Sequence, residues 1–260
     1  MTDITLLIKT SSDRQLKQID ELLKSEFENL SVDVKILGNS AGKWVKVSVS
    51  GEDEVIATSY ITKKIGTSAI SIKKVNKFSI LKGYISKVDT ANQKLTVDVG
   101  VFEPKIIQSV IPLAYLQAQL ADGKKIDLQK ISEIFGLKEN LPLTIKVTRL
   151  NDEESDALQA ELSAEQIERI RLWQQSLLDR LIILGASVSE IETVLERTRL
   201  NRDIISIEEL GMFEHALTCK LGTDAAGLVS RVGRYMRNSR FIVFSAKKPL
   251  ECIGESALTL

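Results

Sequence analysis

The chain has 260 residues, of which 43% are hydrophobic and 27% are charged. This hydrophobic content is enough for packed cores and excludes a globally disordered chain, while the length predicts two or three domains. The 35 basic and 35 acidic residues cancel, so net charge excludes no class of partner and only the distribution of charge is informative.

No apolar run approaches the roughly 18 residues that a membrane-spanning helix needs. Asp3 precedes the first apolar run, which is unlike a secretory signal. We therefore expect a cytoplasmic protein with no membrane partner. The two cysteines, Cys219 and Cys252, lack the spacing of metal ligands, and the single histidine, His215, cannot form a histidine-rich metal site.

The N-terminal residues alternate between strand and helix patterns. In chain order, the patterns predict a strand over 4–10, a helix through Leu16–Phe27, strands over 32–38 and 43–50, and a helix over 52–66. Ser11, Ser12 and Asp13 offer capping oxygens for the first helix. This order is most of a split βαβ sandwich, and we expect such a domain over residues 1–66.

A basic run follows. Between Thr62 and Lys94 there are eight lysines against one acid, Asp89. The lysines interleave with strand-forming residues, so several could share one face of a sheet, with Phe78 and Tyr84 among them. A solvated face or a linker is the alternative interpretation of such a run.

The next segment resembles the S1 variant of the OB fold. It has two alternating strands around the turn 90–93, a strand running into Ile-Pro, helical residues within 125–136, and strands over 141–150 and 156–163. The residues that carry the resemblance are Gly83, Gly100, Ile111, Pro112, Leu162 and Ser163. It implies a β-barrel with a helical insertion over residues 67–163, of a type that binds single strands with aromatic and basic side chains.

This sequence departs from typical S1 domains at the turn between the first two strands. The turn is Thr-Ala-Asn-Gln and lacks the aromatic residues that S1 domains place there. Tyr84 and Tyr115 are then the candidates for base stacking. A barrel that serves only as a scaffold is the alternative.

The last hundred residues predict helices first and then a mixed module. An apolar stripe after Ser163 predicts one helix over 164–184, and a second helix begins at Ser187 or Ser189. Eleven acids against five arginines between positions 151 and 200 argue against nucleic-acid binding by this helical pair. Two strands, a helix over 223–236 and a strand over 241–248 complete an α+β domain over 164–260.

A second basic cluster lies near the C-terminus, with six basic residues and no acid between Arg231 and Lys248. Arginines beside a tyrosine suit contacts to phosphates and bases, and a solvated helix end is the alternative. The candidate nucleic-acid-binding residues of both clusters are Lys73, Lys74, Lys77, Lys82, Tyr84, Lys87, Lys94, Tyr115, Arg231, Arg234, Tyr235, Arg237 and Arg240.

Motifs of catalysis and cofactor binding are absent from the sequence. It contains no GxxxxGK[ST], GxGxxG, HExxH, CxxC or GxSxG string. We therefore expect no catalytic residues, no metal site and no cofactor, and a protein that is not an enzyme.

The segment GTDAAGLVSRVGRYM resembles the start of the helix in ACT-like regulatory domains, through Asp224, Gly227 and Leu228. The resemblance implies that a small ligand would bind at the N-terminus of that helix. A ligand-sensing regulator is thus one alternative function.

Three longer strings of the sequence are GKWVKVSVSGEDEVI, LADGKKIDLQKISEIFGLKENLPLTIKV and RDIISIEELGMFEHALTCKLGTDAAGLVSRVGRYM. They resemble an archaeal family, a domain of unknown function numbered twenty-one-ten. The resemblance spans nearly the whole chain and implies a role in gene expression, without catalytic residues to carry over.

Together these patterns predict an α+β protein of three domains that binds RNA, or a ribonucleoprotein such as the ribosome or RNA polymerase. A protein-interaction adaptor of the same machinery is the other alternative. The sequence predicts no oligomeric state.

Overall fold

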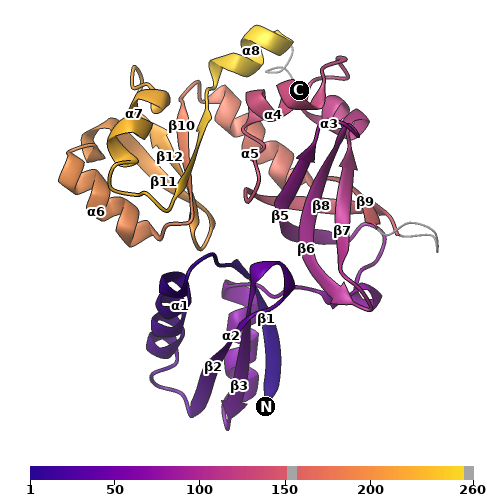
Figure 1. Cartoon of the computed structure of the whole chain (residues 1–260), viewed down its shortest axis with the longest axis vertical. Coiled ribbons are helices and arrows are strands. Elements are labelled where there is room, and N and C mark those ends of the chain that lie inside the picture. Colours follow the sequence, from indigo (N-terminus) through magenta and orange to yellow (C-terminus); the bar gives the residue numbers. More distant parts are fainter. Residues whose placement is uncertain (151–156, 255–260) are drawn as a thin grey trace. The chain divides into compact units, whose positions relative to one another are not determined.

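The computed structural model describes residues 1–150 and 157–254 (Figure 1). They fall into two compact units. Unit 1 consists of Met1–Asn76 and Asp98–Gln108, and unit 2 consists of Lys77–Val97 and Ser109–Leu260. No helix within the described ranges is long and apolar enough to cross a bilayer.

Unit 1 is built on a three-stranded antiparallel sheet with the strand order β1-β3-β2. Ser12 caps the first helix, because its side chain accepts a hydrogen bond from Gln15 N. The elements are β1 (Thr2–Lys9), α1 (Asp13–Glu26), β2 (Val32–Asn39), the 3-10 turn η1 (Ala41–Lys43), β3 (Trp44–Gly51) and α2 (Glu54–Lys64).

After α2 the chain returns along the other edge of β1. Leu7 N donates to Gly66 O at 3.0 Å, Ser68 N donates to Thr5 O at 2.9 Å, and Leu6 and Thr67 form an antiparallel bridge. The last strand of a split βαβ sandwich pairs with the first in this way. The predicted N-terminal fold is therefore confirmed, with its final strand reduced to a short contact.

The central region is a closed barrel of five strands. The neighbours in order are β6, β5, β8, β9 and β7, and a further pairing of β7 with β6 closes the ring. The strands are β5 (Ile80–Asp89), β6 (Lys94–Glu103), β7 (Ile107–Pro112), β8 (Pro142–Arg149) and β9 (Ala157–Leu162). This is the OB strand order, and it confirms the predicted barrel.

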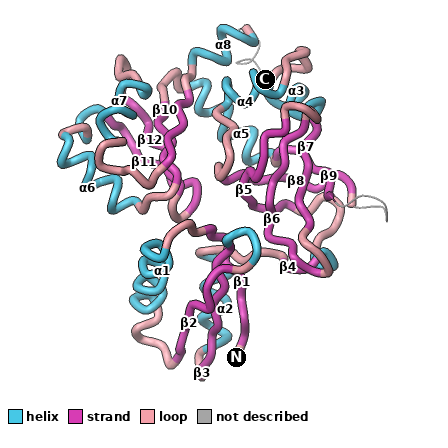
Figure 2. Tube along the Cα trace, in the orientation of Figure 1, coloured by secondary structure: helices cyan, strands magenta, loops and turns pink. Residues whose placement is uncertain are grey.

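The predicted helical insertion lies between β7 and β8, as α3 (Leu113–Leu120) and α4 (Leu128–Phe135). Figure 2 shows both helices at one end of the barrel strands. Asp127 caps α4 by accepting from Lys130 N at 2.8 Å, and Gly136 ends it in the left-handed conformation at φ +66°. A short strand, β4 (Ile70–Ser71), pairs in parallel with β6, and the 3-10 turn η2 (Ile72–Lys74) follows it.

The C-terminal region of unit 2 contains a four-stranded sheet with the order β11-β12-β10-β13. Its elements are α5 (Ala164–Gln175), β10 (Arg180–Leu184), α6 (Val188–Thr198), η3 (Asn201–Asp203), β11 (Ile204–Gly211), β12 (Glu214–Cys219), α7 (Ala225–Val232), β13 (Arg240–Phe244) and α8 (Lys247–Ile253).

The prediction of one helix over 164–184 is wrong. The helix ends at Gln175, and Arg180–Leu184 form the buried strand β10. Leu181 and Ile183 pack with residues of α6 and α7, while on the other face Trp173 of α5 meets Phe244 with ring centroids 5.3 Å apart. A strand covered on both faces is a continuous apolar run, which periodicity does not separate from a buried helix.

The end of the chain also departs from the predicted elements. The helix expected over 223–236 ends at Val232, so Arg234 and Tyr235 lie beyond it. Lys247 and Lys248, which we expected at the end of a strand, begin α8.

Candidate nucleic-acid interface

Tyr84 is not available for base stacking, contrary to the sequence prediction. Its ring is 4% exposed, and its hydroxyl lies 3.5 Å from Glu214 Oε2 on β12. Gly83, Tyr84 and Ile85 are all buried although they alternate along β5. The C-terminal sheet therefore covers the outer face of β5 at this point, which a pattern local to the strand could not show.

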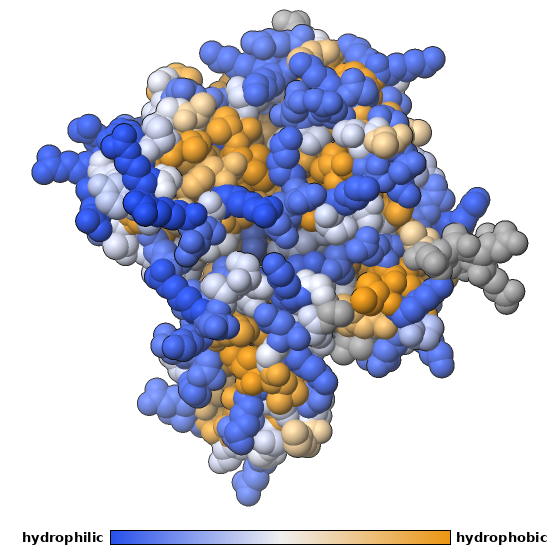
Figure 3. All heavy atoms as spheres, viewed as in Figure 1, coloured by the Kyte–Doolittle hydropathy of each residue, from blue (hydrophilic) through white to orange (hydrophobic). Residues whose placement is uncertain are grey.

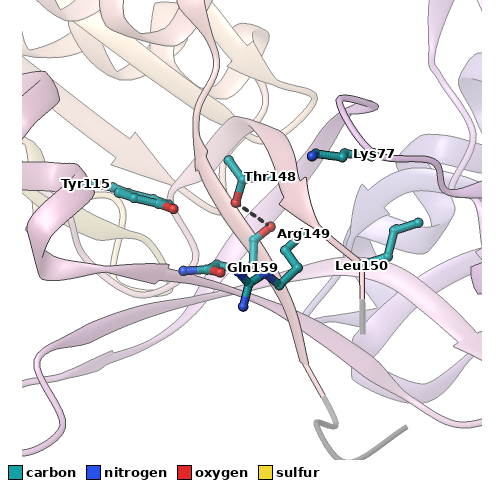
Figure 4. A pocket seen from close by; sticks show the side chains of 6 residues that line it. All are labelled: Lys77, Tyr115, Thr148, Arg149, Leu150 and Gln159. Carbon is teal, nitrogen blue, oxygen red and sulfur yellow. Dashed lines mark hydrogen bonds between the residues drawn. The ribbon is translucent and has the colours of Figure 1, made fainter. Parts of the chain in front are cut away.

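Two other predicted residues, Lys77 and Tyr115, meet in one pocket on the barrel (Figure 4). The pocket has a volume of about 250 Å³. Its lining residues are Lys77, Tyr115, Thr148, Arg149, Leu150 and Gln159. Two cations and one aromatic ring in a small hollow on an OB barrel are the side chains that a nucleotide needs for its phosphate and its base.

Helix α3 fixes the position of Tyr115. Gln119 holds this helix on β9, since its Nε2 donates to Leu162 O at 3.1 Å and its Oε1 accepts from Leu162 N at 3.0 Å. Leu116 and Leu120 are buried beneath the helix, and Tyr115, next to Leu116, stays half-buried. The helix that carries Tyr115 is therefore held in place, while the tyrosine itself stays partly accessible.

Neighbouring strands fix the floor of the pocket. Thr148 Oγ1 donates to the backbone oxygen of Gln159 at 3.1 Å, which ties β8 to β9 (Figure 4). Arg149 is the last residue of β8 and is exposed. The sequence placed Arg149 at the end of a predicted strand but gave no reason to choose it, because it is the pairing of β8 with β5 and the residues before it, such as Phe78 N to Val147 O at 2.8 Å, that brings it near Lys77.

A second feature beside this pocket is an exposed aromatic ring. Phe78 is 58% exposed, and the ammonium groups of Lys77 and Lys146 lie 5.0 and 5.3 Å from its ring centroid. Ile80, 64% exposed, and exposed Lys82 follow at alternate positions of β5. We call Lys77, Phe78, Ile80, Lys82 and Lys146 the Phe78 patch.

The remaining central lysines are less concentrated. Lys73 and Lys74 are exposed on η2 in unit 1. Lys87 is exposed and lies 3.4 Å from the carboxylate of Asp89, which screens part of its charge. Lys94, at the start of β6, is half-buried.

The arginine cluster gathers at the ends of α6 and α7. Arg231 Nη2 donates to Thr198 O, a terminal carbonyl of α6, at 3.2 Å. Tyr235 is 47% exposed, and the guanidinium of Arg197 lies 4.8 Å from its ring centroid. The sequence analysis did not choose Arg197, because Arg197 lies on a helix that the excess of acidic residues had excluded from nucleic-acid binding.

The other predicted arginines differ in their surroundings. Arg234 and Arg237 are exposed. Arg240, the first residue of β13, lines a separate groove of about 470 Å³ with Lys138 of the barrel region and Phe241.

The amide groups expected to hold a small ligand are already bonded. Asp224 Oδ1 accepts from Ala226 N and its Oδ2 accepts from Gly227 N, both at 3.0 Å. The carboxylate of Asp224 therefore occupies the place that the ACT-like interpretation gave to a ligand. Within the described ranges, no three His, Cys, Asp or Glu side chains are grouped as metal ligands.

Comparisons with known proteins extend this description. No functionally curated protein matches the sequence. Among solved structures, a protein from vaccinia virus (Wisconsin strain) is 15% identical, with a TM-score of 0.23, over 34% of this chain and 89% of its own. The intact alpha subunit of aIF2 from Pyrococcus abyssi is 9% identical, with a TM-score of 0.25, over 65% of this chain and 97% of its own.

Family profiles cover most of the sequence. The DUF2110 N-terminal domain matches residues 3–70, the DUF2110 central domain matches residues 75–174, and the DUF2110 C-terminal domain matches residues 178–244. The chain therefore belongs to the DUF2110 family.

Proposed function

We propose that this protein binds single-stranded RNA on its OB barrel and acts, without a catalytic step, on the transcription or translation machinery. The observation that carries the proposal is the pocket that joins Lys77, Arg149 and Tyr115, beside the exposed ring of Phe78. Lys77 belongs to both features, so a strand could pass from one to the other.

The physical basis is electrostatic capture followed by stacking. Lys77, Lys82 and Arg149 would neutralise phosphates, whereas Lys146 is paired with Glu161 at 3.2 Å, which screens part of its charge. Each neutralised phosphate makes binding to a single strand more dependent on salt. Phe78 and Tyr115 would each contribute about 1–3 kcal/mol by stacking on a base. A rigid duplex keeps its bases stacked on one another, so it cannot use this second contribution.

Fluorescence anisotropy with a labelled single-stranded RNA tests the proposal. The double variant Lys77→Glu/Arg149→Glu is expected to bind at least about tenfold more weakly, a loss of about 1.4 kcal/mol or more. The control Lys17→Glu/Lys220→Glu makes the same charge change at exposed positions elsewhere, and we expect its affinity to stay within about twofold of the parent.

Duplex RNA of the same sequence completes the test. The proposal predicts weaker binding of the duplex at every salt concentration. Equal losses in the pocket variant and in the control, or no binding of RNA at low salt, would contradict it.

A further inference from the structure

The outer edge of β11 is open at one end. β11 is a terminal strand of its sheet, so this edge has no partner strand in the described part of the chain. Its second half is protected by Glu208, which accepts from Trp173 Nε1 at 2.8 Å and lies 3.3 Å from Arg169 Nε. Its first half, Ile204–Ile207, has no charged residue, although edge strands usually carry charge or a covering element.

A groove of about 560 Å³ lies along this uncharged half, between α6 and β11. The apolar side chains that line it include Val188 and Leu195 of α6 and Ile205 and Ile207 of β11. Val188 is 41% exposed and Ile205 is 55% exposed; Figure 3 shows the hydropathy of the visible face. The pairing of β11 with β12 shifts register between Ile204 and Ser206, which leaves Ile205 outside the ladder.

The charge of the groove is negative. Glu192 and Glu196 also line it, are both exposed, and lie one turn apart on the same face of α6. Neither has an ion-pair partner within the described residues, and no lysine or arginine is found among the described lining residues. Two free carboxylates repel a phosphate backbone and attract basic side chains.

We propose that this groove binds an extended basic segment of a partner protein, which adds to β11 as a further strand. Its backbone would pair with the open edge of β11 along Ile204–Ile207, through the alternate residues whose backbone groups point away from β12. The side chains that point toward α6 would meet both Val188 and the carboxylates of Glu192 and Glu196, which share one face of that helix. This set would therefore include apolar residues as well as lysine or arginine. This site does not depend on the RNA interface, which lies on the barrel.

A second copy of this chain is a poorer occupant than a basic segment. Pairing of β11 with β11 would bring the same two glutamates, Glu192 and Glu196, into the joint from both sides. Like charges at an interface oppose association. Charge complementarity thus favours a different chain, rich in lysine or arginine.

Selection from a library of random twelve-residue peptides on the immobilised full chain would test the site. We expect the selected peptides to combine apolar with basic residues and to lose affinity when proline replaces their central residues, because proline cannot donate to the edge of β11. The double variant Glu192→Lys/Glu196→Lys should bind them at least about tenfold more weakly.

The control Glu133→Lys/Glu168→Lys changes two exposed glutamates on α4 and α5 and should leave peptide affinity unchanged. Selected peptides without basic residues, or with equal affinity for both double variants, would overturn the proposal. The proposal would also be overturned if sedimentation showed that the parent chain is a dimer and that Glu192→Lys/Glu196→Lys dissociates it. RNA anisotropy on the same variant should match the parent, so failure of this site is distinguishable from failure of the barrel interface.

Discussion

Replacing Asp98 with alanine is expected to lower the free energy of unfolding of unit 1 by about 3–5 kcal/mol. The Asp98 side chain is only 8% exposed and its Oδ2 lies 2.5 Å from Lys9 Nζ. The same oxygen accepts from Trp44 Nε1 at 3.0 Å, while Oδ1 accepts from Gly100 N at 3.0 Å. Removing the carboxylate leaves a nearly buried ammonium without this counter-charge.

Denaturant unfolding followed by the fluorescence of Trp44 measures this loss, in a Trp173→Phe background that removes the other tryptophan. The matched control is Lys9→Met/Asp98→Leu, which removes both charges. We expect it to regain the part of the loss that comes from the uncompensated ammonium, but not the part that comes from Trp44 Nε1 and Gly100 N, which still lack their acceptor. A loss below about 1 kcal/mol in Asp98→Ala would contradict this account.

Replacing Glu214 with glutamine should stabilise unit 2 at alkaline pH. Burial raises the pKa of the Glu214 carboxyl to about 8, and hydrogen bonds from the backbone of Phe213 and from the hydroxyl of Tyr84 offset only part of that rise. The carboxyl group is closely confined, because a Cβ atom on Gly211 would lie 2.4 Å from Glu214 Oε2. The folded protein therefore keeps this acid neutral near pH 7, whereas the unfolded chain ionises it near pH 4.5.

Stability then falls as pH rises between about 4.5 and about 8, because the folded state binds the proton that the unfolded state has lost. The full difference between the pKa values of the unfolded and folded states corresponds to roughly 4–5 kcal/mol of unfolding free energy. We expect Glu214→Gln to match the parent near pH 5 and to exceed it by a few kcal/mol near pH 9. Urea unfolding across this range measures the difference, and Glu168→Gln, at an exposed position, should show none. If the difference in unfolding free energy between Glu214→Gln and the parent did not change with pH, the raised pKa would be contradicted.

The elements of unit 1 and the barrel strands were predictable because their apolar residues alternate or recur at helical spacing. β10 was not, since all of Leu181–Leu184 are buried, and such a continuous apolar run lacks the alternation that marks a strand with one exposed face. Gly100, one of the residues that carry the OB resemblance, has an additional structural role. Gly100 adopts φ +72°, and a Cβ atom there would lie 2.7 Å from the Cβ of Ser68, a close approach that no local pattern reveals.

The candidate site was predictable in part. Lys77 and Tyr115 were chosen as a cation and a stacking ring, but they line one pocket only because β5, β8 and β9 pair side by side and α3 is held on β9. Tyr84 was the wrong aromatic residue and Phe78 the exposed one, because strand alternation alone does not show which stretch of β5 the C-terminal sheet covers.

Photo-crosslinking of the full chain to a single-stranded RNA containing 4-thiouridine, with mass spectrometry of the linked peptides, tests the central claim most directly. The account predicts crosslinks at Phe78 and Tyr115, the two rings accessible beside the basic side chains of the barrel, and their loss in Lys77→Glu/Arg149→Glu. Crosslinks confined to unit 1 or to the acidic face of α6, or equal crosslinking in parent and variant, would contradict it.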